Sequence, residues 1–449
     1  MKYTLRFVFL YLRYILQWLL VAAVIGVCCG AVGAVFYLGV SEATALRTEY
    51  SWLLFILPAA GPVIVWMYRK FGLGNMGTDA VIDAAREGDE LPFRLLPAIF
   101  LGTLITHLFG GSAGREGAAL QIGGVIANRI GTHLFHFDDQ TMRIVTMCGM
   151  SAFFTALFGT PLTATMFVAM FVDVGRIYTA AIFPSLTASM IAFVVSLRLG
   201  MHPFCFFVTI PAFSPSTLLR VIVLAALAGL VSTLFVKTLH FTAKVYQKYL
   251  KNPYLRAAVG GLLIVGLTLA VGTRDYNGAG TDVIQRALEE GKASYFAFLL
   301  KILFTAVTLE AGFKGGEIVP TFFIGAVFGC AFGPILGLPA TFAAAVGLAA
   351  MFAGATNSII ASIFLALEVF GGGGILYFAA GCVISFIASA YDSLYGSQKI
   401  VFSKLRADEL EIHPSKEAHE NSQRVLEAYE RDWERKMNEK KNKENEEDK

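Results

Sequence analysis

A repeated glycine-bounded motif restricts the fold more than any other feature of this sequence. Residues 77–88, GTDAVIDAAREG, recur as residues 280–291, GTDVIQRALEEG, with the same spacing between the two bounding glycines. Two more matching pairs follow in the same order: GSAGREGAALQIGG at 111–124 with GFKGGEIVPTFFIG at 312–325, and GMSAFFTALFGTPLTATMF at 149–167 with GLAAMFAGATNSIIASIFL at 347–365. Because charged residues and glycines match as well as apolar ones, we interpret the pattern as duplication of a unit of roughly 200 residues.

Long apolar segments place the duplicated unit in a membrane. The 449 residues are 56% hydrophobic and 15% charged, whereas average soluble domains have about 25% charged residues. A helix needs about 17 or more apolar residues to cross the hydrocarbon of a bilayer. Segments of this kind begin near Trp18, Leu53, Leu95, Ile144, Ala181, Val221, Ala257, Phe298, Phe322, Phe342 and Leu376. The sequence therefore predicts an all-α polytopic membrane protein.

Two charges lie between glycines inside this apolar sequence. Arg115 and Glu116 are flanked by Gly114 and Gly117, and charged residues at membrane depth are costly and typical of transport pathways. Glycines at this spacing favour a break in a helix, which exposes backbone N–H groups to a small anion. Glycine-interrupted segments at matching places in two repeats indicate a transport site at the repeat interface.

The remaining glycine clusters extend the same hypothesis. FGLGNMGTDAVID supplies free amides and Thr78 before a short helix, and the mirrored clusters DYNGAGTD and GFKGGEIVP supply the second half. Four helix N-termini directed at one point would bind an anion through amides and helix dipoles. The repeat alignment also places Glu116 on Glu317 and Gly124 on Gly325. We therefore expect two acidic residues at the site.

The charge distribution predicts the domain organisation and the orientation. Residues 1–205 and 206–400 form the two membrane repeats, and residues 401–449 form a charged cytoplasmic tail. Basic residues flank the first and last apolar segments, which favours the cytoplasm for both termini and implies an even number of crossings. These residues are Lys2, Arg6, Arg13, Lys399, Lys404 and Arg406.

Metal, disulfide and cofactor chemistry find no support in the pattern. The seven histidines show no ligand spacing. The six cysteines, at 28, 29, 148, 205, 330 and 382, match neither a metal nor a disulfide framework, so we expect small buried packing residues. The net charge of +3 is close to neutral. We expect no metal, no cofactor and no nucleic-acid partner.

The ordered motifs resemble the CLC family of chloride channels and anion/proton exchangers. GREG at 114–117, followed by QIGG, is similar to the family's GREGP segment, with Ala118 in place of proline. GFKGGEIVP at 312–320 resembles its GxFxP region, and Tyr395 lies where the family carries a pore tyrosine. The resemblance extends from about residue 15 to 400.

This resemblance implies a CLC-type fold of two inverted repeats of broken, tilted helices, with the anion site at their interface. It also implies a homodimer with one pathway in each subunit, and a gating role for Glu116. Desolvation favours the protonated carboxyl group, whereas nearby N–H groups favour the charged form. A charged Glu116 can therefore occupy the place of the anion, and a protonated one can release it.

Within the family, three features are similar to the fluoride/proton antiporter branch. Met76 stands where chloride-handling members have a serine, although an ungapped count from Glu116 ends on Asn75 instead. Glu317 matches the second functional glutamate of that branch. The internal glutamate that carries protons in chloride/proton exchangers falls near Met170 or Phe171, and neither side chain can carry a proton.

Two positions depart from the fluoride branch: Val319 replaces a threonine and Thr78 replaces an asparagine. The resemblance assigns gating and proton coupling to Glu116 and Glu317. It assigns anion binding to Met76, Gly77, Thr78, Gly114, Arg115, Gly117, Ala118, Ile318, Val319 and Tyr395, with Arg115 expected to brace the loop. Three assignments have structural alternatives: a pair between Glu116 and Arg115 at a helix end, a salt bridge between Glu317 and Lys314, and an interfacial anchor role for Tyr395. Glu310, Glu368 and Thr281 are expected to be structural.

The sequence thus predicts a secondary anion transporter in the cell membrane, a fluoride/proton antiporter that exports fluoride. Its partners are fluoride or chloride ions, protons, the lipid bilayer and a second copy of the chain. One alternative is a chloride-selective CLC channel or chloride/proton exchanger. Alternatives from other classes are a membrane-embedded enzyme with paired glutamates, for which no nucleophile with a base is present, and a structural membrane protein.

Overall fold

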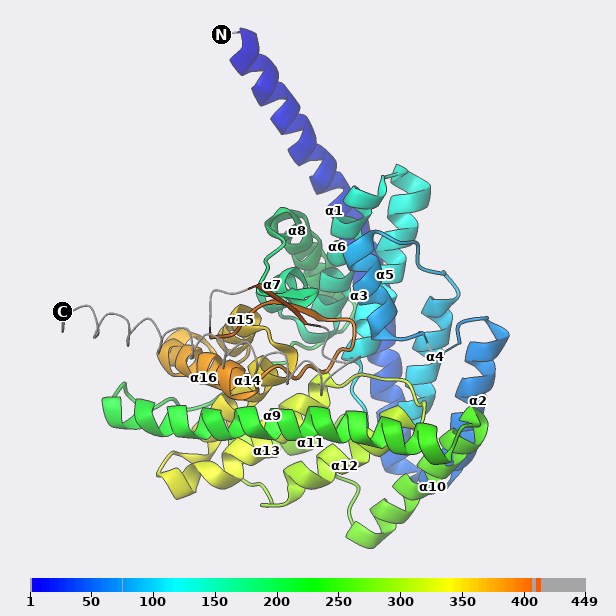
Figure 1. The fold of residues 1–449 in the computed structure, drawn as a ribbon, viewed down its shortest axis with the longest axis vertical. Helices are drawn as coiled ribbons and strands as arrows, with labels where there is room; N and C mark the ends of the chain where they lie inside the picture. Colours follow the sequence, from blue (N-terminus) through cyan, green and yellow to red (C-terminus); the bar gives the residue numbers. More distant parts are fainter. Residues whose placement is uncertain (1, 75, 406–408, 413–449) are drawn as a thin grey trace, which may run out of the picture.

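The protein is helical almost throughout (Figure 1). The computed structural model describes residues 2–74, 76–405 and 409–412. The α-helices are α1 (Lys2–Glu49), α2 (Leu57–Lys70), α3 (Thr78–Glu87), α4 (Leu95–Leu108), α5 (Glu116–Ile130), α6 (Asp139–Phe158), α7 (Pro161–Phe171), α8 (Thr179–Arg198), α9 (Pro215–Tyr249), α10 (Pro253–Val271), α11 (Thr281–Gln285), α12 (Ala297–Glu310), α13 (Ile318–Phe332), α14 (Ala340–Thr356), α15 (Ile359–Phe370) and α16 (Ile375–Ala388). Short turns of other helix types are η1 (Ser51–Ile56), η2 (Gly131–Phe135), η3 (Arg286–Glu290), η4 (Gly333–Leu336) and η5 (Gly372–Gly374).

The predicted membrane spans coincide with apolar helices. Seven helices in the described part of the chain are long and apolar enough to cross a membrane, and several shorter apolar ones accompany them. Asn75, the alternative to Met76, and most of the predicted tail from 401 to 449 lie outside the described residues. The domain boundaries after residues 205 and 400 stay predictions.

Helices recur at the positions that the repeated motifs predict. α4 and α12 both have 14 residues, and α5 and α13 both have 15. The first motif pair begins α3 and α11 directly after Gly77 and Gly280. Its second glycines end α3 and η3 in the left-handed conformation, with φ of 90° at Gly88 and 66° at Gly291. Glycine adopts this conformation at low cost.

The structure corrects the predicted pairing of the two glutamates by one residue. α5 begins at Glu116 and α13 begins at Ile318, so Arg115 and Glu317 hold the equivalent positions just before these helices. The turns before them agree, because the positive φ angles fall at Gly110 and Gly312. Glu116 is therefore equivalent to Ile318, and each half contributes its acid at a different position. The sequence alignment paired the two glutamates because they are identical residues. The first residues of α5 and α13 show which positions are equivalent in space.

Close contacts between glycines pack the middle of the molecule. An added Cβ at Gly123 would overlap the backbone of Gly149, and one at Gly325 would overlap that of Gly347. These pairs press α5 against α6 and α13 against α14. They also make Gly123, rather than Gly124, the partner of Gly325. The central helices α6 and α13 are therefore far more buried than the surrounding α8, α9 and α10.

A short sheet is the one departure from the all-α expectation in the described chain. β1 (Asp173–Val174) pairs in parallel with β2 (Lys399–Phe402), and β2 pairs antiparallel with β3 (Glu409–Ile412). The chain leaving the last membrane helix thus returns beside the end of α7. This return brings the segment that contains Tyr395 next to the first repeat.

The prediction that all cysteines are buried is wrong for two of them. Cys29, Cys148, Cys330 and Cys382 are buried, whereas Cys28 and Cys205 are exposed. Cys28 lies on an exposed face of α1, and Cys205 lies on the loop after α8. Apolar sequence surrounds both residues, but an apolar residue of a membrane helix can face outward, as Cys28 does, and a loop such as that of Cys205 can leave one uncovered.

Candidate functional site

The two repeats meet where the loops before α5 and α13 cross. Gly114 and Gly316 form an isolated antiparallel bridge, with N–H···O distances of 2.7 and 2.9 Å. An added Cβ at Gly117 would come within 2.7 Å of the Gly315 carbonyl oxygen, and one at Gly316 would overlap the Gly117 amide. Only glycine permits this approach. The N-termini of α5 and α13 are thereby held against each other.

Glu116 fills the space between these two helix N-termini. Its side chain is fully buried, and Oε2 accepts a hydrogen bond from the Val319 amide at 3.2 Å. The amides of Arg115 and Glu116 itself also act on the carboxylate. Oε1 has no hydrogen-bond partner among the described residues. A negative group thus lies where two helix N-termini supply unpaired N–H groups, which is the arrangement that binds small anions.

Glu317 lies just before α13 and makes no ion pair in the described part of the chain. Its Oε2 is buried without a hydrogen-bond partner. The alternative of a salt bridge with Lys314 is wrong, because the Lys314 ammonium lies over the Tyr68 ring, 4.1 Å from its centre. Glu317 immediately precedes α13, whose Val319 amide binds the Glu116 carboxylate. The two acids therefore lie in one site, although they are not symmetry equivalents.

A third helix N-terminus approaches Glu116 from α3. Thr78 is the first residue of α3, and its Oγ1 accepts a hydrogen bond from Gln121 Nε2 at 3.2 Å. A Cβ on Gly117 would lie 3.3 Å from the same Thr78 oxygen. Met76 and Gly77 precede Thr78, and the half-buried Met76 side chain packs on the core. The structure thus brings α3, α5 and α13 together as predicted.

The loop before α11, the fourth predicted helix N-terminus, packs against the loop before α5. Asn277 and Gly278, in the loop before it, bond to the carbonyl oxygens of Gly110 and Gly111 at 2.8 and 2.9 Å. Lys301, fully buried on α12, donates to two carbonyl oxygens of the loop at 3.2 and 2.7 Å. Sequence reasoning assigned no role to this buried lysine or to Gln121: Lys301 lies within a helix outside the repeated motifs, and Gln121 was noted only as part of the QIGG motif.

Tyr395 is buried and is not an interfacial anchor. Its side chain is 3% exposed, and its hydroxyl has no hydrogen-bond partner among the described residues. Its ring meets Phe171 edge-on with centres 4.7 Å apart. Phe171 thus fills the region in which an internal glutamate was sought, and it packs on the tyrosine.

The Arg115 side chain lies against two aromatic rings. Its guanidinium lies 4.6 Å from the centre of the Tyr37 ring and 5.8 Å from that of Phe158. Nη2 donates weakly to the Leu157 carbonyl oxygen at 3.4 Å. These contacts join the loop to α1 and α6, which agrees with the expected bracing role.

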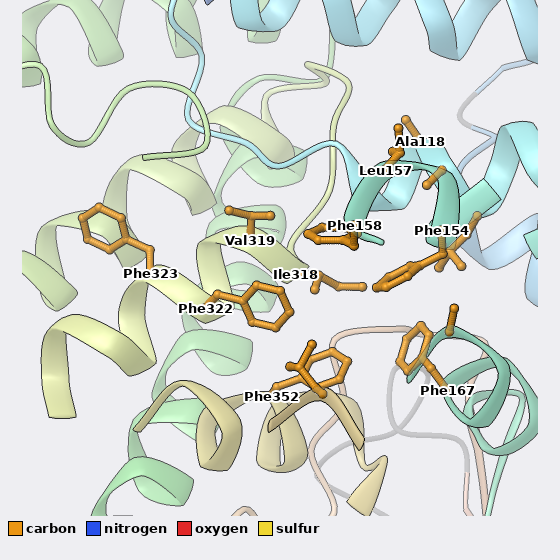
Figure 2. Close-up of a cluster of buried hydrophobic side chains, with 14 of the residues drawn as sticks. Ala118, Phe154, Leu157, Phe158, Phe167, Ile318, Val319, Phe322, Phe323 and Phe352 are labelled. Carbon is orange, nitrogen blue, oxygen red and sulfur yellow. The ribbon is translucent and has the colours of Figure 1, made fainter. Parts of the chain in front are cut away.

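Aromatic side chains form an apolar lining beside the site. Ala118, Ile318 and Val319 are buried, and Figure 2 shows them beside phenylalanines from α6, α7, α13 and α14. The Phe158 and Phe322 ring centres lie 6.1 Å apart, and those of Phe322 and Phe352 lie 5.3 Å apart. Such an apolar surrounding strengthens every hydrogen bond to an anion.

Comparison with known proteins identifies the family. The family model described as voltage gated chloride channel matches residues 60–390. A curated relative, the chloride/fluoride channel protein of Pseudomonas syringae pv. tomato, is 32% identical over 428 residues, which cover 93% of this chain and 94% of that one. The chain belongs to the CLC family of voltage-gated chloride channels.

Solved structures of CLC proteins share the fold. The crystal structure of a CLC-type fluoride/proton antiporter is 32% identical, with a TM-score of 0.83, and the match covers 86% of this chain and 98% of that one. The structure of a slow cyanobacterial Cl⁻/H⁺ antiporter is 19% identical, with a TM-score of 0.73 and coverage of 83% and 94%. This chain is accordingly a multi-pass membrane protein with the CLC fold.

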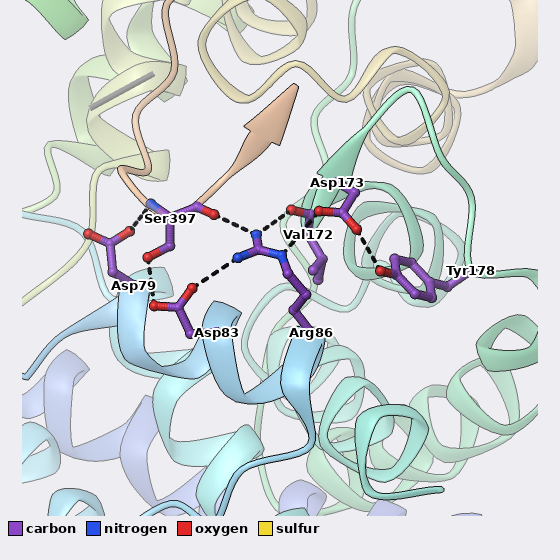
Figure 3. Close-up of polar contacts among 7 residues, drawn as sticks. All are labelled: Asp79, Asp83, Arg86, Val172, Asp173, Tyr178 and Ser397. Carbon is purple, nitrogen blue, oxygen red and sulfur yellow. Dashed lines mark hydrogen bonds and ion pairs between the residues drawn. The ribbon is translucent and has the colours of Figure 1, made fainter. Parts of the chain in front are cut away.

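A polar network connects α3, the residues that follow α7 and the segment before β2 (Figure 3). Arg86 on α3 bonds to Asp173 at 3.1 Å, to the Val172 carbonyl at 2.9 Å and to the Ser397 carbonyl. Asp79, one residue after Thr78, accepts a bond from the Ser397 amide at 2.9 Å. The network holds α3 against the segment that carries Tyr395.

Proposed function

We propose that this CLC protein is a fluoride/proton antiporter that exports fluoride across the cell membrane. The observation that carries the proposal is the position of Glu116, whose carboxylate lies in the place of an anion between two helix N-termini. The names of the 32% identical relative and of the 32% identical solved structure, which both mention fluoride, support the choice of ion.

Glu116 gates the pathway by exchanging places with the anion. When it is charged, its Oε2 accepts the Val319 N–H, and the anion is excluded. Protonation weakens this charge-assisted bond, so the side chain leaves and an anion takes the amides. One proton thus moves for each displacement of the carboxylate, which couples the two ions.

Glu317 passes protons between Glu116 and the aqueous side of the membrane that lies nearer to Tyr395. Its buried, unpartnered Oε2 can hold a proton or a hydrogen bond without breaking an existing contact. The anion path is formed by the remaining predicted residues, and we keep the full set as the proposed binding site: Met76, Gly77, Thr78, Gly114, Arg115, Gly117, Ala118, Ile318, Val319 and Tyr395. We further propose a homodimer with one path per subunit and both termini in the cytoplasm.

The test is simultaneous measurement of fluoride, chloride and pH in liposomes that contain the purified protein. A fluoride gradient should drive proton uptake, and fluoride efflux should exceed chloride efflux. In Glu116→Gln, proton coupling should disappear, whereas Glu290→Gln, at an exposed site, should behave as the unchanged protein.

Two results would decide for other functions. Chloride efflux equal to or greater than fluoride efflux would establish the chloride-selective alternative, for which the family resemblance to H⁺/Cl⁻ exchange transporters gives the basis. Intact coupling in Glu116→Gln would disprove the gating mechanism for either ion. Membership in a family of ion channels and antiporters supports transport rather than an enzymatic reaction of the two glutamates.

A further inference from the structure

A basic cavity lies beside the site and has no part in the proposed transport step. Its volume is about 340 Å³, and its charged lining consists of Arg69, Lys251, Arg256 and Lys314. Val65, Tyr68, Gly74, Pro253 and Gly312 form the rest of the wall, which comes from α2 and the residues after it, the start of α10 and the loop after α12. The described lining contains four cationic side chains and no acidic one.

Several hydrogen-bond donors of the cavity have no acceptor in the described structure. Arg256 Nε and the Tyr68 hydroxyl are buried without partners in the described structure. The Lys314 ammonium has only the face of the Tyr68 ring, and the Arg69 guanidinium lies 4.9 Å from the centre of the Tyr254 ring. Glu310 acts on Arg256 and Lys314 from a distance, and no ion pair within the described residues joins it to either. Donors gathered without acceptors favour an anionic ligand.

The surroundings place the cavity at the membrane surface. Arg69 and Lys70 are the last residues of α2. The ring of Trp66, an exposed tryptophan, has its centre 4.9 Å from the Lys70 ammonium. The adjoining half of α9 adds Lys237, Lys244 and Lys248. Basic residues of this density favour the cytoplasmic face, and interfacial tryptophans mark headgroup depth. Basic pockets between helices on this face recognise phosphate-bearing headgroups.

Size and geometry favour phosphate over a halide. A water molecule occupies about 30 Å³ in the liquid, so a cavity of about 340 Å³ is far larger than a single halide ion needs. Arginine forms paired hydrogen bonds with phosphate oxygens, which it cannot form with a monatomic ion. Two of the four cations are arginines.

We propose that this cavity is a binding site for a phosphate-bearing anion, either the headgroup of an anionic phospholipid or a free phosphate. Lys314 directly precedes Gly315 and Gly316, which touch Gly117 and the loop of Glu116. A ligand bound to Lys314 therefore holds the loop that positions α13. The site adds a regulatory contact two residues from the bridge between the repeats.

Binding is tested by calorimetric titration of the full-length protein in neutral detergent. The probes are short-chain phosphatidylglycerol, phosphatidylcholine of the same chain length, and inorganic phosphate. The phosphatidylglycerol should bind and the phosphatidylcholine should not. Removing one cation, in Lys251→Gln or Arg256→Gln, should weaken binding by about fivefold. Lys251 is exposed on the surface, so Lys251→Gln is not expected to affect folding.

Lys70→Gln is the matched control, because Lys70 neighbours Arg69 in sequence but does not line the cavity. It should bind the probes as the unchanged protein does. Cavity-dependent binding of the lipid alone identifies a headgroup as the ligand, and cavity-dependent binding of inorganic phosphate identifies a soluble source. The proposal is overturned if neither phosphatidylglycerol nor inorganic phosphate binds, or if phosphatidylcholine binds as well as phosphatidylglycerol. It is also overturned if Lys70→Gln weakens binding as much as Lys251→Gln. None of these results depends on which ion is transported.

Discussion

At the scale of residues, two bridging glycines have different neighbours although they are equivalents in the repeat. A Cβ on Gly114 would overlap the Glu116 carboxylate, which is the end of a flexible side chain. A Cβ on Gly316 would overlap the amide of Gly117, which is backbone. The same change should therefore have different consequences on the two sides of the bridge.

We expect Gly114→Ala to fold and to displace the Glu116 side chain, whereas Gly316→Ala should lose about 1–3 kcal/mol of stability because two helix starts must separate. Thermal unfolding in detergent measures the stability, and paired proton and fluoride fluxes measure the gate. Gly114→Ala should retain anion flux with fewer protons per anion. An unchanged proton-to-anion ratio in Gly114→Ala would show that the observed seat of Glu116 is not needed for coupling.

At the scale of elements, α3 and the segment before β2 depend on one arginine. The Arg86 side chain is 11% exposed and that of its partner Asp173 is 6% exposed. Asp173 also accepts a hydrogen bond from the Tyr178 hydroxyl at 2.6 Å. Without the guanidinium, a buried carboxylate and two carbonyl oxygens would lose a donor together.

Arg86→Gln should therefore lower the free energy of unfolding by about 3–5 kcal/mol, which is the cost of leaving a buried carboxylate without its cationic partner. The control is Arg286→Gln, whose pair with Asp275 is 41% and 43% exposed and should contribute about 0–1 kcal/mol. Hydrogen exchange of residues 393–398 should also become faster in Arg86→Gln alone. Equal stability of the two variants would mean that the network does not hold the Tyr395 segment.

At the scale of the whole molecule, the charges of α9 allow the orientation of the protein in the membrane to be predicted. Its 35 residues span about 52 Å at 1.5 Å per residue, enough to cross the hydrocarbon at a steep tilt. Figure 1 shows α9 extending along the whole second half of the molecule. Its lysines lie in its C-terminal half, whereas Arg220 lies near its start.

This asymmetry predicts that Lys248→Cys reacts with a membrane-impermeant maleimide only from the cytoplasmic side, and Arg220→Cys only from outside. Both residues are exposed. The background should carry serine at Cys28 and Cys205, which are the exposed cysteines of the described chain. Labelling of whole cells and of inverted vesicles gives the comparison. The reverse pattern would refute the cytoplasmic position of both termini.

The sequence alone determined the membrane class, the repeat, the family and the residues that meet at the site. It could do so because apolar length, glycine spacing and buried charge are local properties of the chain. Thr78, Glu116 and Glu317 were found in this way, and they lie at the N-termini of α3, α5 and α13, whereas Tyr395 was assigned from the resemblance to the family.

Only the tertiary structure decided which atoms face each other. Glu116 and Glu317 look equivalent in the sequence, yet the bridge between Gly114 and Gly316 makes Glu317 the equivalent of Arg115. The Lys301 contacts, the Arg86 network and the basic cavity join segments distant in the sequence. Such contacts depend on how helices pack, and a pattern along one chain carries no information on which faces meet.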